Sequence, residues 1–380
     1  MLWEKLIRPS MFRLDAERAH ELGMTALKNG LAAPFYVQDS GFGLGSTERF
    51  GLKFTNPLGI AAGFDKNGAV VNQLASLGFG FVEVGTVTLE PQPGNPKPRM
   101  YRLPKNRALI NRLGFNNDGA KAVAMRLSKL DRKCIVGVNI GKNKDVPNEE
   151  ATENYLRTFE IVYRVADYIA VNISSPNTPN LRELQKAENL NELLSALQER
   201  NRALGRSASV SERAFVSRVG ASTLPDGRVS ARKPLLVKIA PDLSDAEIEA
   251  VVDICLKHEI AGVIATNTTI SRDGLQTPNV NRFGAGGVSG KPLTERSNQV
   301  ISTVYKYSKG KLPIIGVGGI FTAEDAFAKI AAGASLLQAY TGFIYGGPRF
   351  AAEVNNGFAK ILKDRGFAGV DDAVGSAVRV

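Results

Sequence analysis

The chain has 380 residues, a formal net charge of +11 and hydrophobic residues at 43% of its positions, which suits one large α/β enzyme domain with extensions, or two domains. Its longest apolar runs end well short of a membrane-spanning length. Two cysteines and two histidines leave almost nothing for a Cys/His metal cluster, a histidine-based triad or a disulfide framework, so we expect no metal site.

Part of the positive charge is local. Residues 199–234 hold eight basic residues against three acidic ones, are rich in Ser, Gly and Arg, and contain Phe215 as their only aromatic residue. A nucleic-acid surface normally interleaves basic and aromatic side chains. We therefore predict a basic surface insertion around 203–233, with an excursion at 207–232, and no nucleic-acid partner.

Residues 1–30 predict two short helices. The first carries Trp3 on an apolar face and is expected to end at Pro9. Asp15 is the expected N-cap of the second, which ends at Gly30. Two interpretations stay open from the pattern alone: a helical cap over a barrel end, or an amphipathic hairpin seated in a membrane interface.

From residue 56 onward, strand-like and helix-like segments alternate. Strands are expected at 58–62, 79–84, 135–140, 168–173, 235–239, 262–266, 313–317 and 335–339. Helices are expected at 68–77, 119–130, 149–165, 190–204, 245–257, 294–307, 323–332 and 349–363, with Asp118, Ser244 and Thr322 as N-caps. Eight such repeats predict an α/β fold, a parallel (β/α)8 TIM barrel. A doubly wound open sheet is the alternative, but segment 59–63 fits its Gly-rich nucleotide turn poorly.

The carboxyl ends of the predicted strands carry polar groups. Catalytic groups of such barrels stand at these ends. They supply two lysines, several amides and several hydroxyls, with Asp65 as the main carboxylate. Lys238 follows an apolar run, where an unpaired buried ammonium would be costly. This set favours an anionic, amide-rich, planar ligand over a metal or a sugar that needs paired acids.

Glycine-rich turns follow the seventh and eighth strands, at 316–319 and 341–342, and a third lies at 286–290. Glycine lets backbone N–H groups approach a phosphate, often beside a short extra helix. Glycines also merely turn corners, but together these turns favour a phosphorylated cofactor.

Ser175 is the sharpest candidate for chemistry. It stands in a Pro-stiffened polar segment after the strand at 168–173, with no histidine expected in reach, so it is a poor nucleophile. It could accept a proton, relayed by a water or a Thr, if a hydride leaves at the same time. The plain alternative is a turn serine that bonds its own backbone.

These residues resemble one known family nearly end to end. The most specific segments lie at 8–20, 56–68 (NPLGIAAGFDKNG), 83–88, 98–102, 111–117 (NRLGFNN) and 171–178 (VNISSPNT). The chain is similar to the dihydroorotate dehydrogenases, specifically the membrane-associated, quinone-dependent class. The soluble classes use a cysteine as catalytic base, whereas Ser175 occupies that place here. The resemblance therefore implies oxidation of dihydroorotate to orotate in pyrimidine biosynthesis, with Ser175 as the base.

The resemblance also implies the ligands and their residues. FMN would be held by Ala62, Gly63, Lys66, Thr86, Asn139, Asn172, Lys238, Thr266, Gly290, Gly319, Tyr340 and Thr341. The substrate would be held by Lys66, Asn111, Asn172, Asn177, Asn267 and Thr268. A membrane quinone would reoxidise the flavin near His20, Arg102 and Tyr340.

By the same resemblance, residues 1–40 form the quinone tunnel and the membrane-associating extension, and residues 41–380 form the FMN-binding barrel. We expect a peripheral protein on the cytoplasmic side of the inner membrane. The insertion around 203–233 departs from the family pattern. Two other FMN barrels stay as alternatives, a 2-hydroxy-acid oxidase and a tRNA dihydrouridine synthase, as does a basic membrane-surface binding protein with a vestigial barrel. The scarcity of histidines argues against the oxidase.

Overall fold

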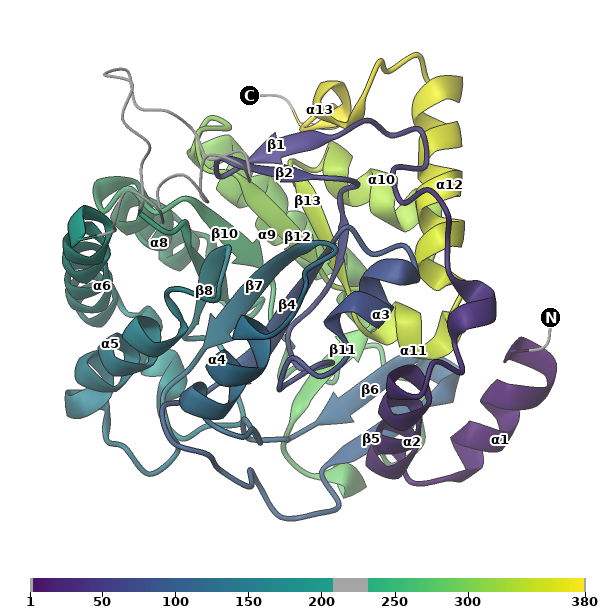
Figure 1. Ribbon diagram of the computed structural model, residues 1–380, viewed down its shortest axis with the longest axis horizontal. Coiled ribbons are helices and arrows are strands. Elements are labelled where there is room, and N and C mark those ends of the chain that lie inside the picture. The colour runs from purple at the N-terminus through teal and green to yellow at the C-terminus, as the bar shows by residue number, and fades with distance from the viewer. Residues whose placement is uncertain (1–2, 208–231, 379–380) are drawn as a thin grey trace.

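The computed structural model describes residues 3–207 and 232–378, and within them it forms a closed parallel barrel (Figure 1). Its strands follow one another around the barrel in chain order, so the open doubly wound alternative was wrong. They are β3 (Leu58–Ile60), β4 (Phe81–Val87), β7 (Ile135–Ile140), β8 (Tyr168–Asn172), β9 (Leu235–Ile239), β10 (Gly262–Ala265), β12 (Ile314–Val317) and β13 (Leu336–Ala339). The predicted insertion at 203–233 lies mostly outside the described residues.

Helices surround the barrel, as the alternating pattern predicted. They are α3 (Val71–Ser76), α4 (Ala120–Ser128), α5 (Ala151–Val162), α6 (Ala187–Ser207), α8 (Asp245–Lys257), α9 (Thr294–Tyr307), α10 (Ala323–Ala331) and α12 (Phe350–Asp364). Ser244 and Thr322 form capping boxes at α8 and α10, as predicted. The predicted cap at Asp118 was wrong: Gly119 is the N-cap of α4, and Asp118 instead pairs with Arg126 at 2.9 Å.

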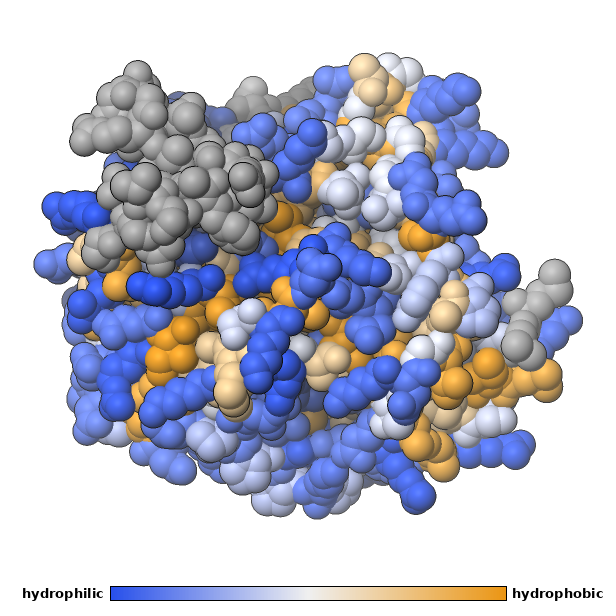
Figure 2. Space-filling model, viewed as in Figure 1, coloured by the Kyte–Doolittle hydropathy of each residue, from blue (hydrophilic) through white to orange (hydrophobic). Residues whose placement is uncertain are grey.

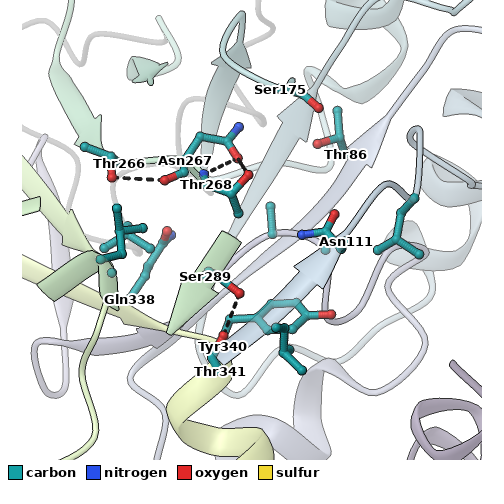
Figure 3. A pocket seen from close by; sticks show the side chains of 18 of the residues that line it. Thr86, Asn111, Ser175, Thr266, Asn267, Thr268, Ser289, Gln338, Tyr340 and Thr341 are labelled. Atoms are coloured by element: carbon teal, nitrogen blue, oxygen red, sulfur yellow. Dashed lines mark hydrogen bonds between the residues drawn. The ribbon is translucent and has the colours of Figure 1, made fainter. Parts of the chain in front are cut away.

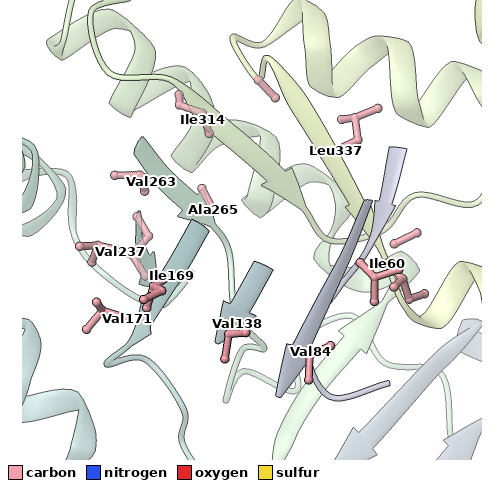
Figure 4. Close-up of a cluster of buried hydrophobic side chains, with 14 of the residues drawn as sticks. Ile60, Val84, Val138, Ile169, Val171, Val237, Val263, Ala265, Ile314 and Leu337 are labelled. Atoms are coloured by element: carbon pink, nitrogen blue, oxygen red, sulfur yellow. The ribbon is translucent and has the colours of Figure 1, made fainter. Parts of the chain in front are cut away.

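Strand pleating sorts the buried side chains into two sets. Outward-facing residues such as Val84, Val237 and Leu337 pack against the helices in the main core (Figure 4). Inward-facing residues near the strand starts, such as Phe81 and Leu236, form a second apolar cluster inside the barrel. The hairpin β1 (Thr47–Arg49) and β2 (Leu52–Phe54) contributes to this inner cluster and closes that end of the barrel.

A second, antiparallel sheet was not predicted. It consists of β5 (Met100–Leu103), β6 (Ala108–Asn111) and β11 (Gly287–Gly290), in the order β11-β6-β5. Its strands are short and come from two connections far apart in sequence, so no single segment carried a strand signal. Figure 1 shows this sheet at the end of the barrel opposite β1 and β2.

The N-terminal residues form a helical hairpin beside the small sheet. A π-helical turn, η1 (Trp3–Ile7), runs into α1 (Arg8–Arg13), and α2 (Ala16–Lys28) follows. Asp15 caps α2 as predicted, but the predicted helix end at Pro9 was wrong. Pro9 lies in the first turn of α1, where a missing N–H costs no helix bond. A buried pair, Arg99 with Glu17 at 2.7 Å, ties α2 to the barrel domain.

Candidate active site

One pocket opens where the barrel strands end, and it gathers most of the predicted site (Figure 3). The strand ends supply its floor, while β6 and β11 of the small sheet supply its opposite wall. The predicted residues that line it are Ala62, Gly63, Lys66, Thr86, Asn111, Asn172, Ser175, Asn177, Lys238, Thr266, Asn267, Thr268, Gly290, Gly319, Tyr340 and Thr341. The short helix expected beside the last glycine turn is present as α11 (Thr341–Gly346).

Three predicted residues lie outside the pocket lining. Asn139 is fully buried beneath it and accepts a hydrogen bond from Thr86 Oγ1 at 2.6 Å. His20 lies on α2, edge-on to Phe64 with 5.0 Å between ring centroids. Phe64 in turn contacts Tyr340 of the pocket, with centroids 5.9 Å apart.

Arg102 holds the turn between α1 and α2. Its guanidinium donates to the backbone carbonyls of Phe12, Leu14 and Asp15, at 3.3, 2.8 and 3.3 Å respectively. It also stacks over the Phe12 ring, 4.8 Å from the centroid. Arg102 therefore fixes the hairpin, and through it the position of His20.

Ser175 follows β8 and is 5% exposed at the pocket wall. Its Oγ accepts a hydrogen bond from the backbone N–H of Asn177 at 3.2 Å, as a turn serine does. Among the described residues, no ionisable side chain is hydrogen-bonded to it. The hydroxyl of Thr178 on the same loop is buried and has no partner among the described residues.

Amides of the pocket hold one another in place. Asn267 Nδ2 donates to Asn172 Oδ1 at 3.2 Å and to Ser174 Oγ at 3.0 Å. Asn177 Nδ2 donates to Asn111 Oδ1 at 3.2 Å. These contacts link three parts of the chain: β8 with the loop that follows it, the loop that follows β10, and strand β6. The pocket therefore presents a preorganised set of amide donors and acceptors.

The two pocket lysines differ in their surroundings. Burial lowers the pKa of Lys66 to about 8, although the carboxylate of Glu17 opposes this shift. The ammonium of Lys238 lies 3.7 Å from a carboxylate oxygen of Glu83, which is fully buried. Within the described chain, Lys66 has no carboxylate within 4 Å, whereas Lys238 is already paired with Glu83. An anion that enters the pocket therefore meets one unpaired cation, Lys66.

Sequence reasoning missed two residues, Glu83 and Gln338. Gln338 lines the pocket, and its Nε2 donates to Glu83 at 2.7 Å. Each interrupts an apolar strand, which is the signal that singled out Lys238. The Gln338 Oε1 atom is buried and without a partner among the described residues. An unsatisfied acceptor is costly, so it fits a ligand that carries an N–H group, as a flavin ring does.

The residues at the predicted phosphate end of the cofactor site are suited to bind a phosphate group. The hydroxyls of Ser289 and Thr341 lie 2.8 Å apart where β11 meets the start of α11. Gly290 and Gly319 have φ values of 99° and 75°, which favour glycine. Hydroxyls and backbone N–H groups are suitable phosphate donors.

Comparisons with known proteins place the chain in one family. The model of the family described as dihydroorotate dehydrogenase matches residues 45–362. A dihydroorotate dehydrogenase (quinone) of Gloeobacter violaceus is 47% identical over 379 residues, covering 98% of each chain. One from Mycobacterium tuberculosis is 44% identical over 380 residues, also covering 98% of each. The crystal structure of the Eimeria tenella enzyme in complex with ferulenol has a TM-score of 0.85 and 40% identity, covering 95% of each chain.

Proposed function

The chain belongs to the dihydroorotate dehydrogenase family, as a quinone-dependent member that oxidises dihydroorotate in pyrimidine biosynthesis, and we propose that it does so with FMN in the barrel pocket and Ser175 as proton acceptor. The observation that carries the proposal is the convergence of Ser175, the amides and Lys66 on one pocket. Membership in this family sets aside the oxidase, the tRNA-modifying enzyme and the vestigial binding protein.

The pocket residues suit the substrate. The amides of Asn111, Asn172, Asn177 and Asn267 match the N–H and C=O edges of a pyrimidine ring, and Thr268 adds a hydroxyl. Lys66 provides the positive charge for the substrate carboxylate. Because the amides are already bonded to one another, little ordering is needed when substrate binds.

Ser175 removes the proton that the reaction releases. Oxidation to orotate takes a hydride from C6 and a proton from C5, which leaves a double bond between them. The flavin supplies the hydride acceptor when it is bound. Ser175 Oγ takes the C5 proton and passes its own proton onward to a water or a threonine. Thr178 on the same loop has a buried hydroxyl that makes no hydrogen bond within the described residues, to Ser175 included.

FMN is the flavin we propose. The ring and ribityl chain would be held by Ala62, Gly63, Lys66, Thr86, Asn139, Asn172, Lys238 and Thr266. The phosphate would be held by Gly290, Gly319, Tyr340 and Thr341. The test is to release the flavin by heat and chromatograph it against FMN, FAD and riboflavin standards, alongside a dihydroorotate-dependent quinone reduction assay. Release of FAD, or purified protein without flavin, would overturn the proposal.

We assign the quinone path and the membrane contact to residues 1–40. His20 is connected to Tyr340 of the pocket through the ring of Phe64. Arg102 holds the turn of the hairpin that carries His20. No helix in the described part of the chain is long and apolar enough to cross a bilayer. Hydrophobic residues gather over the N-terminal helices (Figure 2), and Leu6 and Leu31 are 63% and 70% exposed. These features support peripheral attachment, which we place on the cytoplasmic side of the inner membrane.

Vesicle flotation tests the attachment. The double variant Leu6→Glu and Leu31→Glu should lose binding to phospholipid vesicles and keep its flavin. Leu256→Glu on α8 is the matched control, because that leucine is 41% exposed but far from the hairpin in sequence and on the outer face of the barrel. Equal binding by all three proteins would contradict the assignment.

A further inference from the structure

Glu83 is a fully buried carboxylate inside the barrel, and the mechanism above does not use it. It lies on β4 between Val82 and Val84, which face the outer core, so its own side chain faces inward. It does not line the pocket but lies beneath it, in contact with residues that do. A carboxylate at such a depth is costly unless its surroundings compensate its charge.

Its surroundings are all donors. The carboxylate accepts hydrogen bonds from Gln338 Nε2 at 2.7 Å, Asn139 Nδ2 at 2.8 Å and the Tyr168 hydroxyl at 3.0 Å. Burial, together with the nearby Glu83 charge, raises the pKa of Tyr168 well above its usual value, so this hydroxyl stays a donor. Glu83 therefore sits in a site built for an anion.

The same carboxylate orients two groups of the pocket. Because it can only accept, it requires the NH₂ of Gln338 to face it. Gln338 is a pocket-lining residue, and its Oε1 atom is left buried with no partner among the described residues. It is also the one carboxylate within 4 Å of the Lys238 ammonium in the described chain, at 3.7 Å. Lys238 and Glu83 together present no net charge to the pocket floor.

We propose that Glu83 is a positioning residue that sets the reduction potential of the bound flavin, by balancing the charge of Lys238 and by turning the Gln338 carbonyl toward the cofactor. This inference rests on the proposed function. A reduced flavin carries more negative charge than an oxidised one, so a net positive charge beside it favours reduction. In the poorly polarisable barrel interior this effect is only weakly screened.

The test is a double-mutant cycle in which the charges of Glu83 and Lys238 are removed singly and together. The reduction potential of the bound flavin is measured for each protein anaerobically against reference dyes. Glu83→Gln leaves Lys238 unbalanced and should raise the potential, increasing the ratio of reduced to oxidised flavin about tenfold or more, or about 30 mV for a two-electron couple. Lys238→Met leaves Glu83 unbalanced and should lower the potential. The double variant should return close to the wild-type value, because net charge is restored.

Unfolding of the flavin-loaded proteins in urea gives a second readout. Each single variant leaves one buried charge alone and should unfold at lower urea than the double variant does. Asp167→Asn is the matched control. This carboxylate pairs with Arg132 at 3.0 Å just before β8, at the other end of the barrel, so its loss should lower stability and leave the potential unchanged.

The outcomes separate this inference from the proposed function. Wild-type protein without flavin, or with flavin that dihydroorotate does not reduce, would overturn the proposed function itself. The role of Glu83 alone would be overturned by a different result. The wild-type protein would contain a flavin that dihydroorotate reduces, but Glu83→Gln would change the ratio of reduced to oxidised flavin by less than twofold. A shift of the same size in Asp167→Asn would also overturn it, because the effect would then be general to lost stability.

Discussion

Two layers fill the inside of the barrel, and they are built from the same strands. Near the strand starts, Phe81 of β4 and Leu236 of β9 belong to an apolar cluster. Two residues further along the same faces come Glu83 and Lys238, which form an ion pair. Residues two positions apart point to the same face of a strand. The inward face of each of these two strands therefore carries an apolar core residue first and a charged residue two positions later. The first layer stabilises the barrel, and the second holds polar groups for the pocket.

Removing the proton acceptor is the sharpest way to separate the chemistry from the packing. Ser175→Ala should lower the rate of flavin reduction by dihydroorotate about 10²- to 10⁴-fold, the usual value of a positioned base. Flavin content and urea stability should stay near wild type, because within the described residues the Ser175 side chain makes a single hydrogen bond, accepted from the Asn177 N–H. A variant that loses flavin or unfolds would show that Ser175 holds the pocket together instead.

Truncating a side chain of the apolar layer should have the opposite effect: it should lower stability and leave turnover nearly unchanged. Leu236→Ala removes a fully buried side chain and should lower the free energy of unfolding by about 2–5 kcal/mol. Turnover per folded, flavin-loaded molecule should stay within about twofold of wild type. Fitted urea curves and flavin-normalised assays measure both quantities. A large loss of turnover with normal stability would break the division between the layers.

A pH profile tests the charge of Lys66 in the pocket. Burial lowers the pKa of Lys66 to about 8, so it is a cation below that pH and is neutral above it. If the cation binds the substrate carboxylate, kcat/KM for dihydroorotate should fall about tenfold per pH unit above this value. Lys66→Met should have a lower kcat/KM, and its kcat/KM should not fall in this way above a pH of about 8. If the same fall persists in the variant, it arises from the titration of another group.

A change outside the barrel gives the smallest effect. Ser244 caps α8 and accepts a hydrogen bond from the Glu247 N–H at 3.4 Å. Ser244→Ala should cost about 1 kcal/mol of unfolding free energy. It should leave the flavin potential and kcat unchanged, since nothing it touches reaches the pocket. A change in either would mean that the outer helices are coupled to the site.

The sequence predicted the barrel because its strands are uniform apolar runs with helices between them. It predicted most pocket residues because polar side chains follow those runs directly, as at Asn172 and Thr266. It could not predict the small sheet, whose strands gain their partners only through the fold. Glu83 shows the same limit: its unusual position was visible, but its pairing with Lys238 joins strands that are not neighbours in the barrel.

Helix ends were predicted where the cap acts locally. Asp15, Ser244 and Thr322 each bond a backbone N–H within three residues, so the local sequence was sufficient. The predictions at Asp118 and Pro9 were wrong for two different reasons. Asp118 forms an ion pair with Arg126, and Pro9 lies in the first turn of α1, which begins at Arg8 where the pattern predicted a helix end.

The most direct test of the central claim is anaerobic. Purified protein in mild detergent is mixed with dihydroorotate while the flavin absorbance is followed, and a quinone is then added. The account predicts bleaching by dihydroorotate and recovery with the quinone, but not with fumarate or NAD⁺. A flavin that dihydroorotate leaves unchanged, or that NAD⁺ or fumarate reoxidises as well as quinone does, would contradict it.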